Sequence, residues 1–198
     1  MIWTARYDYP APPERVAHIF ADQAFALAVA LAAGAVSPQV EVSAEPSGEF
    51  TVTARTVNPA TSLPAQFATL APGGLEIRQA QVWEAPGPAG ERAATLAGEI
   101  TGALVRITAQ IALTPTPQGS QLAVDGEITA ALPLLGAALE KAAMPAALGY
   151  LAAQDQVLRR WIAQELPADP PERSTQQSTQ QSTEGWDGCQ HVDHEDQS

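Results

Sequence analysis

The chain has 198 residues, of which 45% are hydrophobic and only 6% aromatic, and its formal net charge at pH 7 is −12. This length accommodates one domain of ordinary size, and an acidic chain without a basic stripe excludes nucleic acid and anionic membranes from the expected partners. A single cysteine, Cys189, excludes an internal disulfide framework and favours a reducing, cytoplasmic location.

The first third of the chain predicts a strand followed by helical structure. Residues 2–9 alternate, with Trp3, Tyr7 and Tyr9 on one side, as in a half-buried strand. Three prolines end that strand, and an apolar stripe then continues to Gly34 with a break near Asp22, which predicts one or two short helices. The most apolar run, residues 24–36, is shorter than the ~20 residues that span a bilayer, and no signal-peptide pattern precedes it, so we expect no stable membrane insertion.

The central part of the chain predicts a succession of short strands. Alternating segments occupy residues 39–45, 49–57, 75–84, 91–101, 104–114 and 120–131. Residues 58–74 form the longest irregular stretch between them, and the other separators are short and turn-like. Because short connections join antiparallel neighbours, we expect one antiparallel sheet of seven strands.

The last periodic segment, from about Leu134 to Leu166, predicts the longest helix of the chain. A single long helix after a run of strands buries itself most simply across the sheet. Pro145 and Gly149 interrupt its pattern and predict a bend near residues 141–149. Residues 167–198 carry seven acids, one base and a Ser/Thr/Gln repeat, so we expect a folded domain over 1–166 and a disordered acidic tail over 167–198.

Several blocks of the sequence resemble the START-like superfamily, which includes lipid-transfer domains, pollen-allergen-like proteins and polyketide cyclases. The opening YDYPAPPERVAHIF is similar to its common strand, proline turn and helix. QVWEAP, GALVRITAQIAL and LAVDGEITAALPLLGAALEK are similar to an uncharacterised actinobacterial family within it. The resemblance covers about residues 2–165 and implies an α+β helix-grip fold, in which a curved seven-stranded antiparallel sheet wraps around the C-terminal helix.

This fold implies a cavity between the sheet and the final helix, and small Ala, Thr and Gly side chains on the sheet would leave it open. The inward faces of the predicted elements supply the candidate ligand-binding residues, which are Tyr7, Val52, Ile77, Gln79, Gln81, Trp83, Leu139, Ala143, Ala146 and Tyr150. The two glutamines have two interpretations. They are positioned hydrogen-bonding groups in an apolar pocket, or they meet water on an edge strand.

Catalytic and metal motifs give weaker signals. The sequence has no phosphate-binding loop and no nucleophile elbow, and His18 is expected on a helix surface. The exposed face of a strand is the expected place for the pairs Asp125 and Glu127, and Glu99 and Thr101. Cys189 to Glu195 holds metal-ligand residue types in the tail without rigid spacing, so no metal site and no cofactor are expected. Arg159 and Arg160 are expected to cap the final helix rather than clamp an anionic ligand.

Three functions remain open, in decreasing order of support. The first is binding of a hydrophobic small molecule, such as a lipid or a polyketide-like compound. The second is a protein-interaction module with an exposed apolar patch near Phe67 and Leu70. The third is a cyclase- or hydrolase-type enzyme in which Gln79, Gln81, a tyrosine or a buried carboxylate polarises a carbonyl. The sequence leaves catalysis and oligomeric state undecided, with a non-enzymatic role favoured.

Overall fold

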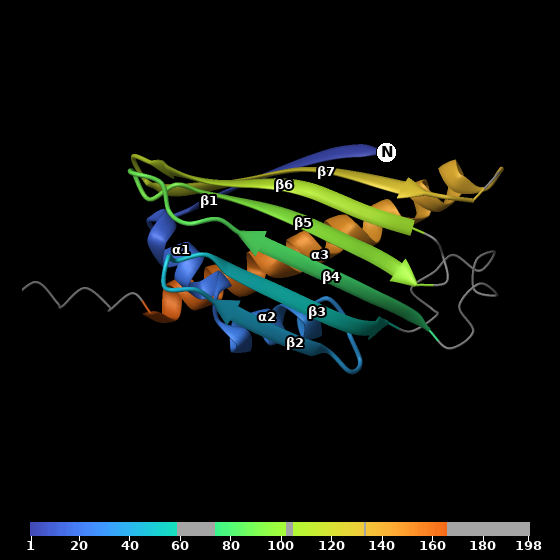
Figure 1. The fold of residues 1–198 in the computed structure, drawn as a ribbon, viewed down its shortest axis with the longest axis horizontal. Coiled ribbons are helices and arrows are strands. Elements are labelled where there is room, and N and C mark those ends of the chain that lie inside the picture. Colours follow the sequence, from blue (N-terminus) through green and yellow to red (C-terminus); the bar gives the residue numbers. More distant parts are fainter. Residues whose placement is uncertain (59–73, 102–104, 133, 166–198) are drawn as a thin grey trace, which may run out of the picture. The chain divides into compact units, whose positions relative to one another are not determined.

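Seven strands form one antiparallel sheet in the order β1-β7-β6-β5-β4-β3-β2, as Figure 1 shows. The computed structural model describes residues 1–58, 74–101, 105–132 and 134–165. The strand order follows the chain except at β1, which pairs with the last strand. The predicted seven-stranded sheet is confirmed, and its strands are β1 (Ile2–Tyr9), β2 (Gln39–Ala44), β3 (Phe50–Asn58), β4 (Leu75–Trp83), β5 (Arg92–Thr101), β6 (Val105–Thr116) and β7 (Gly119–Ala130).

Two short helices follow β1, which decides between the one or two helices that the sequence allowed. They are α1 (Pro13–Phe20) and α2 (Gln23–Ala32), and their axes differ by 76°. Asp22 begins α2, because its carboxylate accepts hydrogen bonds from the backbone N–H groups of Ala24 at 2.6 Å and Phe25 at 3.4 Å. No single helix in the described ranges is long and apolar enough to cross a membrane, although α1 and α2 together pass that test of length and composition.

The final helix, α3 (Gly136–Glu165), runs without a break through Pro145. It crosses the same face of the sheet that α1 and α2 cover (Figure 1), so the predicted helix-grip architecture is confirmed. The predicted bend near Pro145 stays a prediction. The capping role expected for Arg159 and Arg160 is wrong. The helix continues to Glu165, so both arginines lie before its last turn, which has no basic residue.

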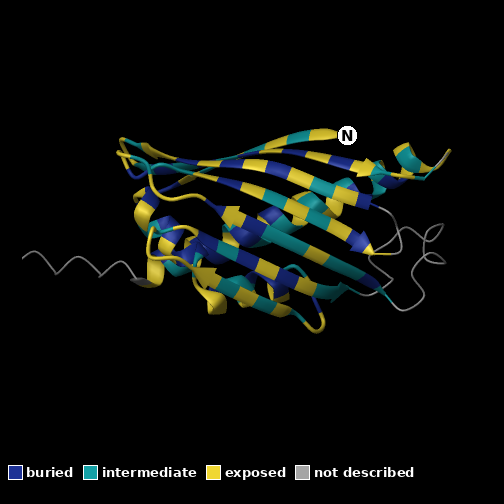
Figure 2. Ribbon diagram, in the orientation of Figure 1, coloured by how far each residue is buried: buried dark blue, intermediate teal, exposed yellow. Residues whose placement is uncertain are grey.

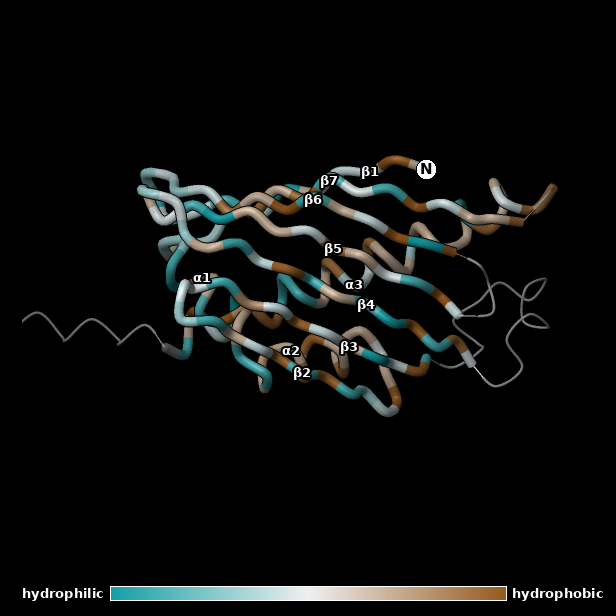
Figure 3. Tube along the Cα trace, viewed as in Figure 1, coloured by the Kyte–Doolittle hydropathy of each residue, from teal (hydrophilic) through white to brown (hydrophobic). Residues whose placement is uncertain are grey.

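Burial alternates along the strands, as Figure 2 shows, and hydropathy alternates with it (Figure 3). The buried residues form two hydrophobic clusters rather than one continuous core. The larger cluster joins α1, α2 and the C-terminal half of α3 to one end of the sheet, and it contains Phe20, Phe50 and Trp83. The smaller cluster holds Ile128 and Leu139 beneath the N-terminal half of α3. Trp3 packs against both clusters.

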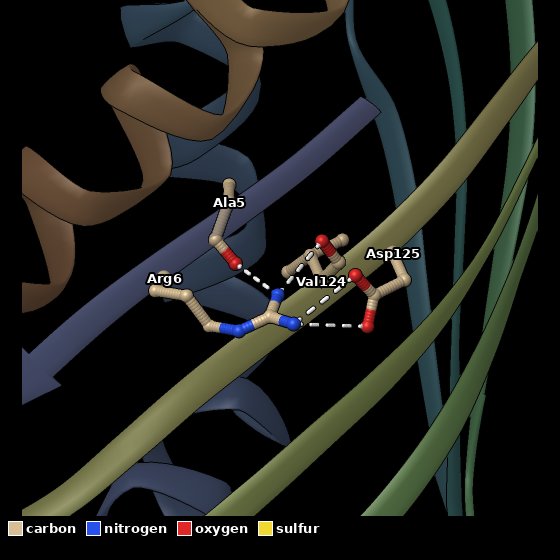
Figure 4. Close-up of polar contacts among 4 residues, drawn as sticks. All are labelled: Ala5, Arg6, Val124 and Asp125. Carbon is tan, nitrogen blue, oxygen red and sulfur yellow. Dashed lines mark hydrogen bonds and ion pairs between the residues drawn. The ribbon is translucent and has the colours of Figure 1, made fainter. Parts of the chain in front are cut away.

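Charged residues occupy the opposite, outer face of the sheet. Arg6 on β1 pairs with Asp125 on β7, with both carboxylate oxygens 3.2 Å from Nη2, and it also donates to the carbonyl oxygens of Ala5 and Val124 (Figure 4). Glu76 on β4 accepts from Arg55 Nε at 3.0 Å and from Arg78 Nε at 2.7 Å. These two arginines lower the pKa of the Glu76 carboxyl to about 2.

Glu76→Gln is expected to reduce stability in a pH-dependent way. A carboxyl whose pKa is lowered by folding contributes stability that is fully present above its ordinary pKa, 4.5, and is lost as the pH falls toward about 2. The difference in free energy of unfolding between wild type and Glu76→Gln should therefore be small but measurable at pH 7 and should shrink below pH 4.5. Urea unfolding at several pH values measures it, with Glu127→Gln as the control, because Glu127 is on the same face and lies opposite Ile2 and Thr108 rather than an arginine. A difference that grows as the pH falls would contradict the ion-pair account.

Candidate functional site

A pocket of about 460 Å³ lies between the sheet and the N-terminal half of α3. Its lining holds Ile100 and Ala143 of the smaller cluster, together with Leu96 and Tyr150, which are partly buried and pack against the larger cluster. The pocket therefore lies between the two clusters. Strands β3 to β6 form one wall, and α3 and the end of α2 form the other. The lining residues are Trp3, Ala30, Ala32, Ala33, Ala35, Thr56, Asn58, Ile77, Gln79, Leu96, Gly98, Ile100, Ile107, Ala142, Ala143, Pro145, Ala146, Ala147, Gly149, Tyr150 and Leu151.

Small side chains keep this space open. Ten of the 21 lining residues are alanine or glycine. The sequence predicted small residues on the sheet, but most of them lie on the helices: all eight lining alanines come from α2, the segment after it, and α3. Ala32, Pro145, Ala146 and Gly149 are exposed as well as lining, so the mouth of the pocket lies between the end of α2 and α3. Residues of both helices therefore border the opening of the pocket.

One hydrogen bond crosses the pocket from sheet to helix. Gln79 Nε2 on β4 donates to the Tyr150 hydroxyl oxygen on α3 at 2.8 Å. Burial raises the pKa of Tyr150, so this side chain is a neutral phenol at physiological pH. Strand β4 lies between β3 and β5, so the edge-strand interpretation of the glutamines is wrong. Gln79 instead lies in the lining of the pocket, as the first interpretation expected.

Two other polar side chains in the lining have buried atoms without a hydrogen-bond partner among the described residues, and these are Trp3 Nε1 and Asn58 Oδ1. The Trp3 ring lies over Gly126, its partner across β1 and β7, where an added Cβ atom would collide with Trp3 Cζ2. Gly126 thus lets the indole lie flat against the sheet. The pocket combines an apolar wall with a few polar groups, which is the usual composition of a small-molecule site.

A family profile described as "Protein of unknown function (DUF2505)" matches residues 4–162. The chain belongs to the DUF2505 family. No curated protein matches this DUF2505 member in sequence. Among solved structures, it is similar to a conserved protein from Geobacillus kaustophilus (14% identity, TM-score 0.55), with 83% of this chain and 96% of that one covered. It is also similar to a protein from Thermus thermophilus (16% identity, TM-score 0.53), with 83% and 99% covered.

A START superfamily protein from Mycobacterium smegmatis is matched as well, at 16% identity and a TM-score of 0.49, with 82% of this chain and 97% of that one covered. At these identities the likeness concerns the fold alone. The likeness to the Geobacillus kaustophilus and Thermus thermophilus structures supports the fold, and it assigns no activity to the DUF2505 chain.

The structure brings five of the ten candidate residues together around the pocket, namely Ile77, Gln79, Ala143, Ala146 and Tyr150. It places the other five outside the lining. Tyr7, Val52 and Trp83 belong to or pack against the larger hydrophobic cluster, Leu139 belongs to the smaller cluster, and Gln81 is buried beside Val52, its partner in the β3–β4 register. A direct part in ligand binding for these five stays a prediction without support from the pocket geometry.

Only one end of β4 contributes to the pocket, and this difference between its two ends has a physical cause. Ile77, Gln79, Gln81 and Trp83 all point to the helix-covered face, as the period of two requires. At the Trp83 end the aromatic rings of α1, α2 and β3 fill the space, with Phe20 and Phe50 stacked on the indole at centroid distances of 5.1 and 5.4 Å. At the Ile77 end the facing residues are alanines of α2 and α3. Local alternation identifies the face, whereas the helix packing decides which end stays open.

Trp3, Thr56 and Asn58 are lining residues that were not among the candidates. The alternation of residues 2–9 placed Trp3 on the correct side of its strand, but only the pairing of β1 with β7 brings it to the pocket. Thr56 follows Val52 and Ala54 along one face of β3, so the same alternation could have found it. Asn58 is the next residue on that face, but the predicted strand ended at residue 57 and left it out.

Other candidate chemistries lie away from the pocket. His18, Glu99, Asp125 and Glu127 are exposed, as expected. Within the described ranges no group of three or more metal-ligating residues occurs, and the tail residues Cys189 to Glu195 lie outside those ranges.

Arg159 contacts Asp155 and Tyr9 near the C-terminal end of α3. It forms an ion pair with Asp155 at 3.0 Å, and its guanidinium lies 5.1 Å from the centre of the Tyr9 ring. Burial, with a smaller contribution from Asp155, raises the pKa of Tyr9, so that phenol is also neutral. Neither Tyr9 nor Arg159 is a lining residue, so this cluster stands apart from the pocket.

Proposed function

We propose that this protein binds a small, predominantly apolar molecule in the pocket between the sheet and α3. The observation that carries the proposal is the pocket itself: about 460 Å³, within the ~300–1,000 Å³ typical of ligand sites, with a lining dominated by apolar and small side chains. An apolar space of this size that stays empty makes the folded protein less stable, because its lining residues lose packing contacts that a bound molecule would restore. The resemblance to the START-like superfamily favours a lipid or a polyketide-like compound as the occupant.

Titration of the full chain with N-phenyl-1-naphthylamine, a neutral dye whose fluorescence rises in apolar surroundings, tests this proposal. We expect saturable binding at one site per chain and competition by apolar molecules of similar size. Native mass spectrometry of gently purified protein gives a second readout, a mass increment of one small molecule. A linear, unsaturable fluorescence increase together with no displaceable fraction would contradict the proposal.

A protein-interaction role has one observation in its favour. Large apolar side chains on and around α2 and α3 are exposed, among them Leu27, Leu31, Val36 and Leu148. Leu31 and Leu148 each precede a residue at the mouth of the pocket. The patch predicted around Phe67 and Leu70 lies outside the described residues. If this role were the main one, the double variant Leu31→Ser and Leu148→Ser would no longer capture a partner protein in a pull-down, and its dye binding would be unchanged.

The enzyme hypothesis finds less support in the lining. The pocket residues include no carboxylate, histidine, cysteine, lysine or arginine, and Tyr150 is the titratable group among them. The carboxylates Glu99, Asp125 and Glu127 are on the exposed face of the sheet. A cytoplasmic location remains part of the proposal, in keeping with one cysteine in the chain.

A further inference from the structure

The polar groups of the pocket narrow the class of molecule that it accepts, and this step rests on the proposed binding function. None of the 21 lining residues carries a formal charge at neutral pH. A carboxylate or an ammonium group that entered this lining would lose its hydration and meet no opposite charge. The wall of the pocket therefore favours uncharged ligands over fatty-acid-like anions of the same length.

The Gln79–Tyr150 pair is not saturated by its mutual hydrogen bond. Because the Tyr150 oxygen accepts from Gln79 Nε2 at 2.8 Å, the hydroxyl hydrogen remains available to donate. Among the described residues the structure gives no acceptor for that hydrogen and no donor to Gln79 Oε1. The pair thus offers one donor and one acceptor to a group within the pocket.

Two other lining residues carry polar atoms that do not reach the surface of the pocket. Trp3 Nε1, a donor only, and Asn58 Oδ1, an acceptor, are buried without partners in the described part of the chain. Buried polar atoms are nearly always hydrogen-bonded in folded proteins. Both atoms are shielded from solvent, so they lie behind the surface of the pocket, and the Gln79–Tyr150 pair remains the polar group that is offered to a ligand.

We infer that the pocket takes an uncharged, largely apolar molecule that carries a hydroxyl or carbonyl oxygen, and that the Tyr150 hydroxyl donates to this oxygen. The oxygen acceptor is common to both ligand groups. A hydroxyl ligand donates in addition to Gln79 Oε1, so an alcohol uses both halves of the pair and a ketone uses one.

Displacement of N-phenyl-1-naphthylamine by decan-1-ol, decan-2-one and decanoate at pH 8 tests the inference on the full chain. We expect the alcohol and the ketone to displace the dye at concentrations at least about tenfold lower than decanoate does. Tyr150→Phe should weaken the binding of decan-1-ol by about two- to tenfold beyond any change in its affinity for the dye, as loss of one hydrogen bond does. Tyr7→Phe, a tyrosine outside the lining, is the matched control and should change neither affinity.

The outcomes separate this inference from the function on which it rests. Decanoate as effective as decan-1-ol, or an unchanged alcohol affinity in Tyr150→Phe, would overturn the inference while dye binding still supports an apolar site. Absence of saturable dye binding would overturn both. If Tyr150→Phe proves unstable in thermal unfolding, Gln79→Met replaces it as the test variant. Gln79→Met removes the acceptor that an alcohol uses and a ketone does not. It should therefore reduce the difference in affinity between decan-1-ol and decan-2-one.

Discussion

Gly98→Phe is expected to lower the affinity for a neutral apolar dye more than tenfold while the protein stays folded. Gly98 lies on β5 between Gln79 of β4 and Ile107 of β6, in the middle of the pocket floor. A Cβ atom added there meets its neighbours at 3.5 Å or more, which is ordinary van der Waals contact. The backbone therefore accepts a side chain at this position, and a phenyl ring takes the space that a ligand needs.

The stability of Gly98→Phe should stay within about 1 kcal/mol of wild type. A strand-forming residue replaces glycine, and the ring buries apolar surface in a space that was open. Ala97→Phe is the matched control, because Ala97 is the next residue on β5 and is exposed on the outer face. Dye titration and thermal unfolding of both variants give the comparison. Equal loss of affinity in the two variants, or none in Gly98→Phe, would mean that the dye binds elsewhere.

Trp83→Ala is expected to lower the free energy of unfolding by about 3–5 kcal/mol, the usual loss for a buried aromatic residue. Trp83 is 1% exposed and lies between the rings of Phe20 and Phe50, stacked at interplanar angles of 23° and 10°. Truncation would remove both stacks and leave a void that the sheet and α1 cannot close. Against a total stability of ~5–15 kcal/mol for a typical domain, this loss is large.

Two variants separate packing from ligand binding at this position. Val82→Ala, on the exposed face next to Trp83, should change stability by less than about 0.5 kcal/mol. Trp83→Phe keeps an aromatic ring between its neighbours and should retain dye affinity, since Trp83 lies outside the pocket lining. Urea unfolding measures the first effect and dye titration the second. A strong loss of dye affinity in a stable Trp83→Phe protein would make Trp83 a ligand-binding residue instead.

The sequence predicts the fold well because its signals are local. Period-two alternation, turn residues and one long helical pattern determine the seven strands and α3, and Asp22 marks the division between α1 and α2 by a capping interaction within three residues. The site depends on non-local packing. Whether the inward face of β4 is filled or open depends on which helix residues face it, aromatic at Trp83 and alanine at Ile77.

The position of Trp3 in the pocket lining also depends on non-local packing. Its side of β1 is readable from alternation, yet its place in the pocket depends on pairing between the first and last strands and on Gly126 beneath its ring. The alanines of α2 and α3 have an equally non-local role. Each is unremarkable in its own helix, and only the packing of the two helices over the sheet turns them into the wall of a cavity.

The location of a bound probe tests the central claim most directly. In an NMR experiment with protonated decan-1-ol on protein deuterated except at tyrosine rings and at isoleucine and leucine methyl groups, we predict nuclear Overhauser contacts from the probe to the Tyr150 ring. The methyl groups of Ile77 and Ile107 should give further contacts. These side chains come from α3, β4 and β6, so contacts to all three place the molecule between sheet and helix. Contacts confined to the exposed Leu27, Leu31 and Leu148 would contradict an internal binding site.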